Sequence, residues 1–277
     1  MTYIPTTIED RKIIVRMRRN SLLFIVAIVL LYVMIYVFGS PSKTVVNDET
    51  VIVNKGIPDV LLFLLGVFVI ILAPIVMKKI REPIAKALDE ECDPRKHFVL
   101  SRAFIRFRNR QLFDKATDYL YLGDFLSLFE CTEKMISSRS SKLRFCGLFN
   151  KARGCFFKGD QETFSETVKQ FEDELAKRRK RFGKKQKEAL DSWAIILHLL
   201  DAILKKDADA AGQYRTVGTW NQSKITVGYV NYVKGLAAKL AGDNEAADSL
   251  FRSVAETCRK NILAGLAEKQ LNCEETA

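Results

Sequence analysis

The chain has 277 residues, a formal net charge of +11 and a hydrophobic content of 48%, which is ordinary for a globular protein. Its six cysteines include no CxxC pair, and all of them lie at residue 92 or later. This usage argues against cysteine-based metal or redox chemistry. It favours thiols that pack in a core within a reducing compartment.

Two apolar stretches in the first third of the chain predict a pair of transmembrane helices. Residues 21–38 and 60–77 are each 18 residues long and contain no charged side chain. A helix of this length covers about 27 Å, close to the roughly 30 Å hydrocarbon core of a bilayer. We therefore predict membrane spans at both stretches, a basic N-terminal segment at 1–20, a short extracytoplasmic loop at 39–59 and a basic juxtamembrane linker at 78–93.

The positions of Lys and Arg predict the orientation of these helices. Five basic residues precede the first span and six lie between residues 78 and 96, whereas the loop has only Lys43 and Lys55. Because basic flanks stay in the cytoplasm, both termini are expected there. The absence of organelle targeting signals favours the inner membrane of a bacterium. Within the loop, β-branched runs on both sides of Asn47–Thr50 are compatible with a small hairpin.

Residues 94–271 have the pattern of an all-α domain, and residues 272–277 form a flexible tail. Apolar residues recur at spacings of three and four through the domain. Four dipeptides divide this pattern into helix pairs, because a left-handed residue can end one helix and the following Asp can cap the next. These dipeptides are Gly123–Asp124, Gly159–Asp160, Lys206–Asp207 and Gly242–Asp243. Turns this short make the paired helices antiparallel neighbours.

The residues around these turns resemble the tetratricopeptide repeat family. That family favours small side chains seven positions before and five positions after the turn residue, where paired helices touch. The matching positions are Ala116, Ala152, Ala211, Gly235 and Ala247, and the departures are Leu128, Phe164 and Leu199. The resemblance covers roughly residues 110–258. It implies a solenoid of α-hairpins whose concave groove holds a peptide or helix of a partner protein, following the two-helix transmembrane hairpin.

A basic run interrupts the spacing of the turns. The third turn follows the second by 47 residues, whereas the other neighbouring turns are 36 residues apart. The excess of eleven residues equals the length of Lys177–Lys187, which we interpret as an insertion that protrudes from the helical stack. Its cations are Lys177, Arg178, Arg179, Lys180, Arg181, Lys184, Lys185 and Lys187. A second basic stripe is expected just after the membrane, at Arg102, Arg106, Arg108 and Arg110.

Both basic segments are candidates for contact with anionic lipid. Each Lys or Arg near such a surface contributes about 1 kcal/mol of binding free energy. An acidic protein partner and a merely solvated surface are the alternatives. Nucleic acid is disfavoured, because proteins that bind single strands place aromatic side chains among the cations, and this run holds only Phe182.

No catalytic motif is present in the sequence, which has no Walker loop, GxGxxG, GxSxG or HExxH. His198 lies in an apolar helical stretch within reach of Asp201, and His97 follows an acidic cluster at 89–93 whose spacing matches no metal site. The sequence therefore predicts no catalytic residue, metal or cofactor. It favours a membrane-anchored cytoplasmic scaffold or adaptor for protein–protein interaction. The alternative is a subunit of an oligomeric channel or of a transport or secretion complex.

Overall fold

The computed structural model describes residues 6–39, 42–46, 49–53, 58–104, 108–214, 218–219 and 222–272, and most of their side chains. Two compact units make up the chain, and their boundary falls inside one helix, after Pro83. We call residues 7–83 the long-helix unit and residues 84–277 the helical domain. Apart from one pair of strands, all the regular structure in the described residues is helical, so the prediction of an all-α fold is confirmed.

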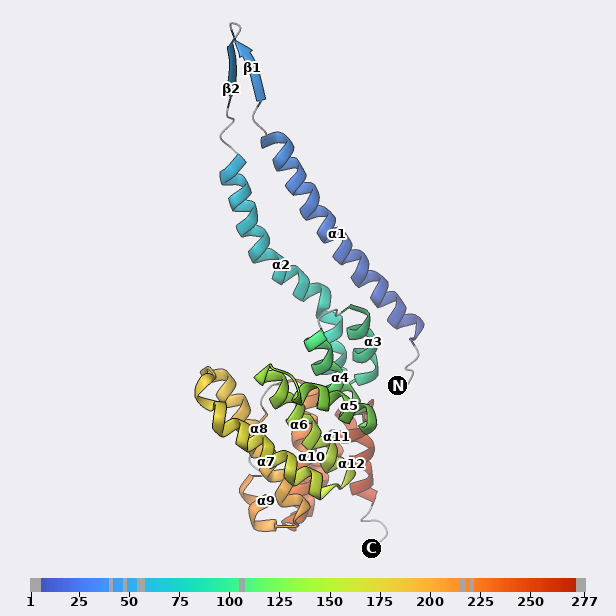
Figure 1. The fold of residues 1–277 in the computed structure, drawn as a ribbon. Helices are drawn as coiled ribbons and strands as arrows, with labels where there is room; N and C mark the ends of the chain where they lie inside the picture. Colours follow the sequence, from blue (N-terminus) through green and yellow to red (C-terminus); the bar gives the residue numbers. More distant parts are fainter. Residues whose placement is uncertain are drawn as a thin grey trace. The chain divides into compact units, whose positions relative to one another are not determined.

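The long-helix unit contains two helices joined through a β-hairpin. Helix α1 spans Ile8–Gly39, strands β1 and β2 span Ser42–Val46 and Glu49–Val53, and helix α2 begins at Pro58 and ends at Asp89 in the helical domain. The strands pair antiparallel, with Ser42 opposite Val53, so the small hairpin is found where the β-branched runs indicated it (Figure 1).

A reciprocal cap fixes the start of α1. The Thr7 amide donates to Asp10 Oδ2 at 2.9 Å, and the Asp10 amide donates to Thr7 Oγ1 at 3.1 Å. This arrangement satisfies two amides that would otherwise have no partner in the first turn. The helix therefore begins well before the first apolar stretch and continues into it.

Helices α1 and α2 are each 32 residues long. Among the side chains that the structure describes, no helix carries an apolar stretch of the length needed to cross a bilayer. The predicted spans reach beyond those side chains, because residues 35–38 of the first and residues 60–63 and 65 of the second lie outside them. The two transmembrane helices are therefore not confirmed by the structure and stay a prediction.

The helical domain consists of consecutive helices after the end of α2. Their bounds are α3 Pro94–Phe104, α4 Arg108–Leu122, α5 Phe125–Ile136, α6 Ser141–Lys158, α7 Gln161–Arg178, the 3-10 helix η1 Arg179–Arg181, α8 Lys184–Leu204, α9 Ala208–Tyr214, α10 Lys224–Leu240, α11 Asn244–Thr257 and α12 Ile262–Asn272. The pairs α4–α5, α6–α7, α8–α9 and α10–α11 are neighbours in space.

One turn geometry joins each of these four pairs. In the first, Gly123 has φ +74°, the Asp124 amide donates to Tyr119 O at 3.0 Å, and Asp124 Oδ1 accepts from the Ser127 amide at 3.1 Å. The first helix thus ends in a left-handed residue and the second begins on an aspartate cap. Gly159, Lys206 and Gly242 repeat the positive φ, and Asp160, Asp207 and Asp243 repeat the cap.

Alternate helices also contact one another around the domain. Helix α4 packs on α6, α6 on α8, α8 on α10 and α10 on α12, and α12 also contacts α4. The main core lies between these helices and includes Phe145, Phe164, Tyr229 and Phe251, which are almost fully buried. The contacts between these helices therefore form a closed ring, whereas the two ends of an open solenoid would not touch.

Close helix contact explains one glycine in α10. A Cβ added at Gly235 would lie 2.7 Å from Phe251 Cε1 on α11. Gly235→Ala is therefore expected to lower the free energy of unfolding by about 1–3 kcal/mol through overpacking. Chemical denaturation of the full chain in detergent, followed by circular dichroism, measures this change.

Gly265 in α12 provides the matched control, because a Cβ there meets no atom within 4 Å. Gly265→Ala is expected to raise the free energy of unfolding by about 0.5–1 kcal/mol, since alanine favours a helix interior. Equal effects of the two substitutions would contradict the α10–α11 packing.

Candidate functional site

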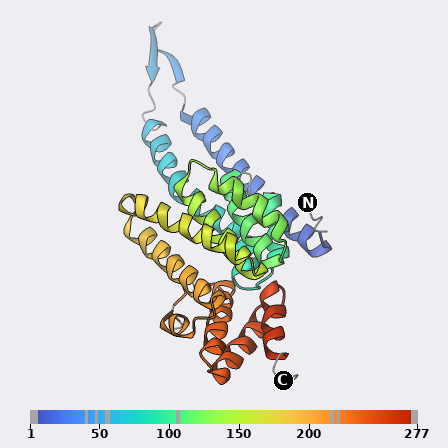
Figure 2. The ribbon, with the colours of Figure 1, turned by 60° about the horizontal axis from the view of Figure 1, so that its bottom comes forward.

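The basic run lies where α7 turns into α8, at the outer end of this helix pair (yellow in Figures 1 and 2). Helix α7 continues to Arg178, η1 follows directly, and α8 begins at Lys184. The Phe182 ring packs against Phe145 of the core at 5.6 Å between centroids. The additional residues therefore extend two helices and a tight turn, whereas the sequence suggested an inserted segment outside the helices.

Two arginines of this run hold the helices together. Arg178 Nε lies 2.8 Å from Glu174 Oε2, and its Nη1 donates to Ser141 Oγ at 3.0 Å. Arg179 Nη2 lies 2.7 Å from Asp191 Oδ2, which joins η1 to α8. The lysines differ from them, since Lys177, Lys180, Lys184 and Lys185 are exposed. Lys187 is half-buried, and the side chain of Arg181 lies outside the described residues.

The second basic stripe is described only at its beginning. Arg102 is exposed near the end of α3. Arg106 lies outside the described residues, as do the side chains of Arg108 and Arg110. The prediction that these four arginines form one stripe is therefore not tested by the structure.

An arginine lies buried in the middle of the helical domain, on α6. Arg153 is only 3% exposed. Its Nη2 donates to the Tyr121 hydroxyl at 2.6 Å, and its Nη1 donates to Asn150 Oδ1 at 3.2 Å. The guanidinium carbon lies 3.8 Å from the centre of the Tyr229 ring. We call Arg153 with Tyr121, Asn150 and Tyr229 the arginine cluster.

The described contacts of Arg153 include no carboxylate. An isolated buried charge is costly, and it is tolerated only where hydrogen bonds and polarisable groups replace water. Here a hydroxyl and an amide oxygen accept two of its bonds, and a cation–π contact with Tyr229 contributes about 0.5–2 kcal/mol. The arginine cluster therefore links α4, α6 and α10 through a single side chain.

Aromatic side chains fill the face on which the resemblance implied a groove. Phe157 of α6 lies 6.3 Å from Tyr229 and 6.1 Å from Tyr232 of α10, measured between ring centroids. Together with the arginine cluster, these rings occupy the space between α6 and α10. A partner peptide could not lie there unless these side chains moved, so the expected open groove is closed by the chain itself.

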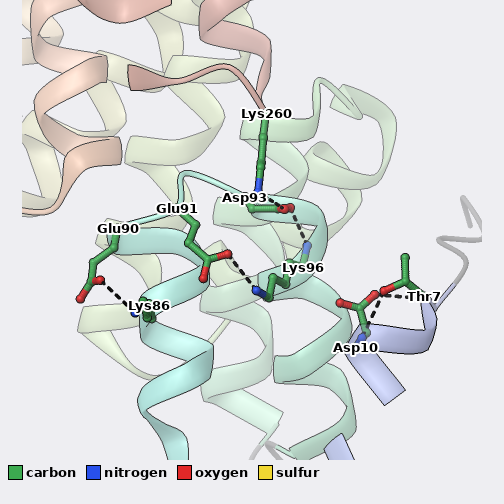
Figure 3. A network of polar contacts seen from close by, with 8 residues as sticks. All are labelled: Thr7, Asp10, Lys86, Glu90, Glu91, Asp93, Lys96 and Lys260. Atoms are coloured by element: carbon green, nitrogen blue, oxygen red, sulfur yellow. Dashed lines mark hydrogen bonds and ion pairs between the residues drawn. The ribbon is translucent and has the colours of Figure 1, made fainter. Parts of the chain in front are cut away.

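The junction of α2 and α3 contacts the turn between α11 and α12. Lys260 Nζ lies 3.3 Å from Asp93 Oδ2 (Figure 3). Asn261 Nδ2 donates to Cys92 O at 3.4 Å. Cys92 is fully buried with φ +49°, and a hydrogen bond with the Cys258 thiol lowers its pKa. These contacts hold the beginning of the helical domain against its last helix pair.

The acidic cluster before α3 has structural partners. Asp93 Oδ1 accepts from the Lys96 amide at 2.8 Å and caps α3, and Glu91 Oε2 lies 2.9 Å from Lys96 Nζ (Figure 3). Lys86 and Glu90 form a further ion pair at 3.7 Å (Figure 3). Across the part of the chain that is described, His, Cys, Asp and Glu side chains form no group of three that could hold a metal.

The two histidines have different surroundings. His97 is buried, and its Nδ1 lies 2.7 Å from Oδ1 of the fully buried Asp118. His198 is exposed, and its Nε2 lies 3.2 Å from Glu172 Oε1. Asp201, which the sequence placed within reach of His198, instead pairs with Lys205 at 2.6 Å.

Titration of the His97–Asp118 pair is coupled to folding. Burial lowers the pKa of His97, but the charge of Asp118 and its hydrogen bond raise it, and the net shift is upward. Burial raises the pKa of Asp118 to about 7, against the opposite effect of His97. Both net shifts mean that the folded pair holds protons more tightly than the unfolded chain does.

The arginine cluster could not be predicted from the sequence as a unit. Tyr121 and Tyr229 are far from Arg153 in the chain, and no local pattern predicts their contact. One local signal was available, because Arg153 lies between Ala152 and Gly154 and is followed by the apolar run 155–157. A charge in such a stretch indicates a buried polar contact.

Removing the Tyr121 hydroxyl tests the arginine cluster. Tyr121→Phe is expected to lower the free energy of unfolding by about 1–3 kcal/mol, because Arg153 Nη2 would lose its buried acceptor. In an Arg153→Met background the same change should cost less than about 0.5 kcal/mol, and a double-mutant cycle measures the difference. Tyr119→Phe on the same helix is the control, and its effect should be equal in both backgrounds.

The His97–Asp118 pair is expected to stabilise the fold more at low than at high pH. Since both folded pKa values are raised, its contribution is complete below the usual value of 3.8 for Asp. It declines as pH rises toward the pKa of about 7 of Asp118 and through the raised pKa of His97. Urea denaturation of the full chain and of His97→Gln/Asp118→Asn should differ more at about pH 5.5 than at about pH 8.5. A difference that grows with pH would contradict this assignment.

Comparison with known proteins adds no assignment to this geometry. No protein-family model matches the chain, and neither a curated protein nor a solved structure is significantly similar to it.

Proposed function

We propose that this protein is a membrane-anchored scaffold whose helical domain binds a protein partner at the cytoplasmic face of a bacterial inner membrane. Helices α1 and α2 cross the bilayer at residues 21–38 and 60–77, and both termini lie in the cytoplasm. The helical domain, a repeat of helix pairs similar to the tetratricopeptide family, presents its outer surface to the partner. No catalytic step is assigned to it.

The observation that carries the proposal is the exposure of apolar side chains on α1 and α2. The exposed residues are Leu22, Leu23, Ile25, Val26, Val29, Leu30, Leu31, Tyr32, Val33, Met34, Leu64, Val67, Phe68, Ile70, Ile71 and Ile75. On α1 they surround the helix and do not form one stripe, so packing on a single neighbour would leave many of them in water. A lipid environment covers all sides of such a helix.

Side chains of the protein itself fill the space between α6 and α10, so we place the partner on the outside of the helical domain. The arginine cluster and Phe157 already fill the space between α6 and α10. The second helices of the pairs, such as α7 and α11, form the outer side and carry exposed polar residues including Glu245, Arg252 and Glu256. Anchoring raises the effective concentration of this surface toward partners in the same membrane.

The four exposed lysines of the α7–α8 turn are the remaining candidates for contact with anionic lipid or with an acidic partner. They are Lys177, Lys180, Lys184 and Lys185. Arg178 and Arg179 contribute less to such contact, because both are engaged in ion pairs with Glu174 and Asp191. Lipid contact by this turn is secondary to the anchor in the proposed function.

Alkaline carbonate extraction of native membranes tests the anchor. We expect the full chain to stay in the membrane fraction, because about 18 apolar residues in each helix favour the bilayer core. The variant Ile25→Lys/Val29→Lys should be partly extracted, since each charge costs about 2.5–3.5 kcal/mol near mid-span. Leu126→Lys, at an exposed site in the helical domain, is the control and should stay with the membrane.

Complete extraction of the unmodified chain would refute the anchor. Crosslinking in native membranes, followed by purification of the full chain, tests the scaffold. A defined partner attached to residues of the helical domain supports it. Self-association through α1 and α2 alone, with ion conductance in reconstituted bilayers, would instead support the channel-subunit alternative.

A further inference from the structure

The first turns of α1 carry a row of cations on one face. Ile8, Arg11, Lys12, Val15, Arg16 and Arg19 line a shallow depression on this helix. They recur at spacings of three and four, which places them on one side of the helix. Ile8 is 76% exposed and Val15 is 65% exposed, so apolar side chains lie in the open between the cations. We call this row the cationic stripe.

The same face of α1 continues as an apolar surface. Continuing the spacing of three and four leads to Leu22, Leu23, Val26, Val29, Leu30 and Val33, and all of them are exposed. The cationic stripe therefore passes directly into a row of exposed aliphatic side chains. A bilayer has the same order, with phosphate groups at the surface and hydrocarbon beneath them.

The dimensions agree with this order. At 1.5 Å per residue, Arg19 lies about 3 Å and Arg16 about 8 Å from Ser21, where the uncharged stretch begins. The headgroup layer on each side of a bilayer is about 5–7 Å thick, and long basic side chains extend toward it. Arg11 and Lys12 lie about 15 Å from Ser21 along the axis, where a charged surface still attracts them weakly across a screening length of about 8–10 Å.

We infer that the cationic stripe binds the phosphate headgroups of anionic phospholipids in the cytoplasmic leaflet. Arg16 and Arg19 contact the phosphates, because a guanidinium donates two parallel hydrogen bonds to such a group. Arg11 and Lys12 add attraction that depends on salt, and Val15 lies between the charges as an apolar contact. The inference rests on the proposed membrane anchor and names the lipid class that the anchor selects.

Electron spin resonance of the reconstituted full chain tests this inference. The protein is placed in phosphatidylcholine vesicles that contain a small fraction of spin-labelled phosphatidylglycerol or, separately, spin-labelled phosphatidylcholine. Around the unmodified chain we expect several-fold enrichment of immobilised phosphatidylglycerol over phosphatidylcholine. Arg11→Gln/Lys12→Gln/Arg16→Gln/Arg19→Gln should reduce this enrichment at least threefold. Raised salt should reduce it in the unmodified chain.

A matched variant removes the same number of charges elsewhere. Lys134→Gln/Lys142→Gln/Lys158→Gln/Lys206→Gln changes four exposed lysines that belong to neither basic segment and should keep the enrichment. If the stripe variant inserts poorly, Arg16→Gln/Arg19→Gln replaces it, and half or more of the enrichment should be lost. Equal enrichment in the stripe variant and the unmodified chain would overturn the inference, as would loss in the lysine variant alone.

Carbonate extraction of the same vesicles distinguishes failure of the membrane anchor from failure of the lipid site. An unmodified chain that is extracted refutes the membrane anchor and, with it, the lipid site. A chain that resists extraction but shows no preference for phosphatidylglycerol keeps the anchor and refutes only the lipid site.

Discussion

The helical domain depends on a turn in which a left-handed residue is followed by a capping aspartate. At Gly159 and Asp160 the chain reverses within two residues, and the hydrogen bonds of both helix ends are satisfied locally. Because the same turn joins four helix pairs, the first helices of successive pairs lie side by side. Their contacts then place α4, α6, α8, α10 and α12 around a common core.

The interior formed in this way contains a buried arginine among its polar residues. Arg153 replaces a hydrophobic side chain at the centre of the core, and its bonds to Tyr121 and Asn150 have fixed directions. Hydrophobic contacts alone tolerate several arrangements of the helices, whereas a buried guanidinium fits only where its acceptors and the Tyr229 ring are in place. We therefore expect the arginine cluster to favour one arrangement of α4, α6 and α10.

Local features could be predicted from the sequence, and distant contacts could not. The turns at Gly123 and Gly242 follow from two adjacent residues and their conformational preferences, so the sequence placed them correctly. The end of α7 was misjudged, because Lys and Arg are good helix formers and the turn needs only Gly183. The filled space between α6 and α10 could not be predicted, because it depends on contact between Phe157 and Tyr229, and no repeat pattern contains this contact.

The contact between the α2–α3 junction and the α11–α12 turn joins residues that are far apart in the chain. Cys92 and Asn261 are separated by 169 positions, so the hydrogen bond between them can form only after both residues have been synthesised. During synthesis the N-terminal helices leave the ribosome long before Asn261 does, so this contact cannot form until residue 261 has been made. Chains that terminate before Cys258 lack the residues that contact Cys92, so this buried residue would be exposed in them. Proteases that act on buried residues once these are exposed would therefore remove chains truncated before this contact.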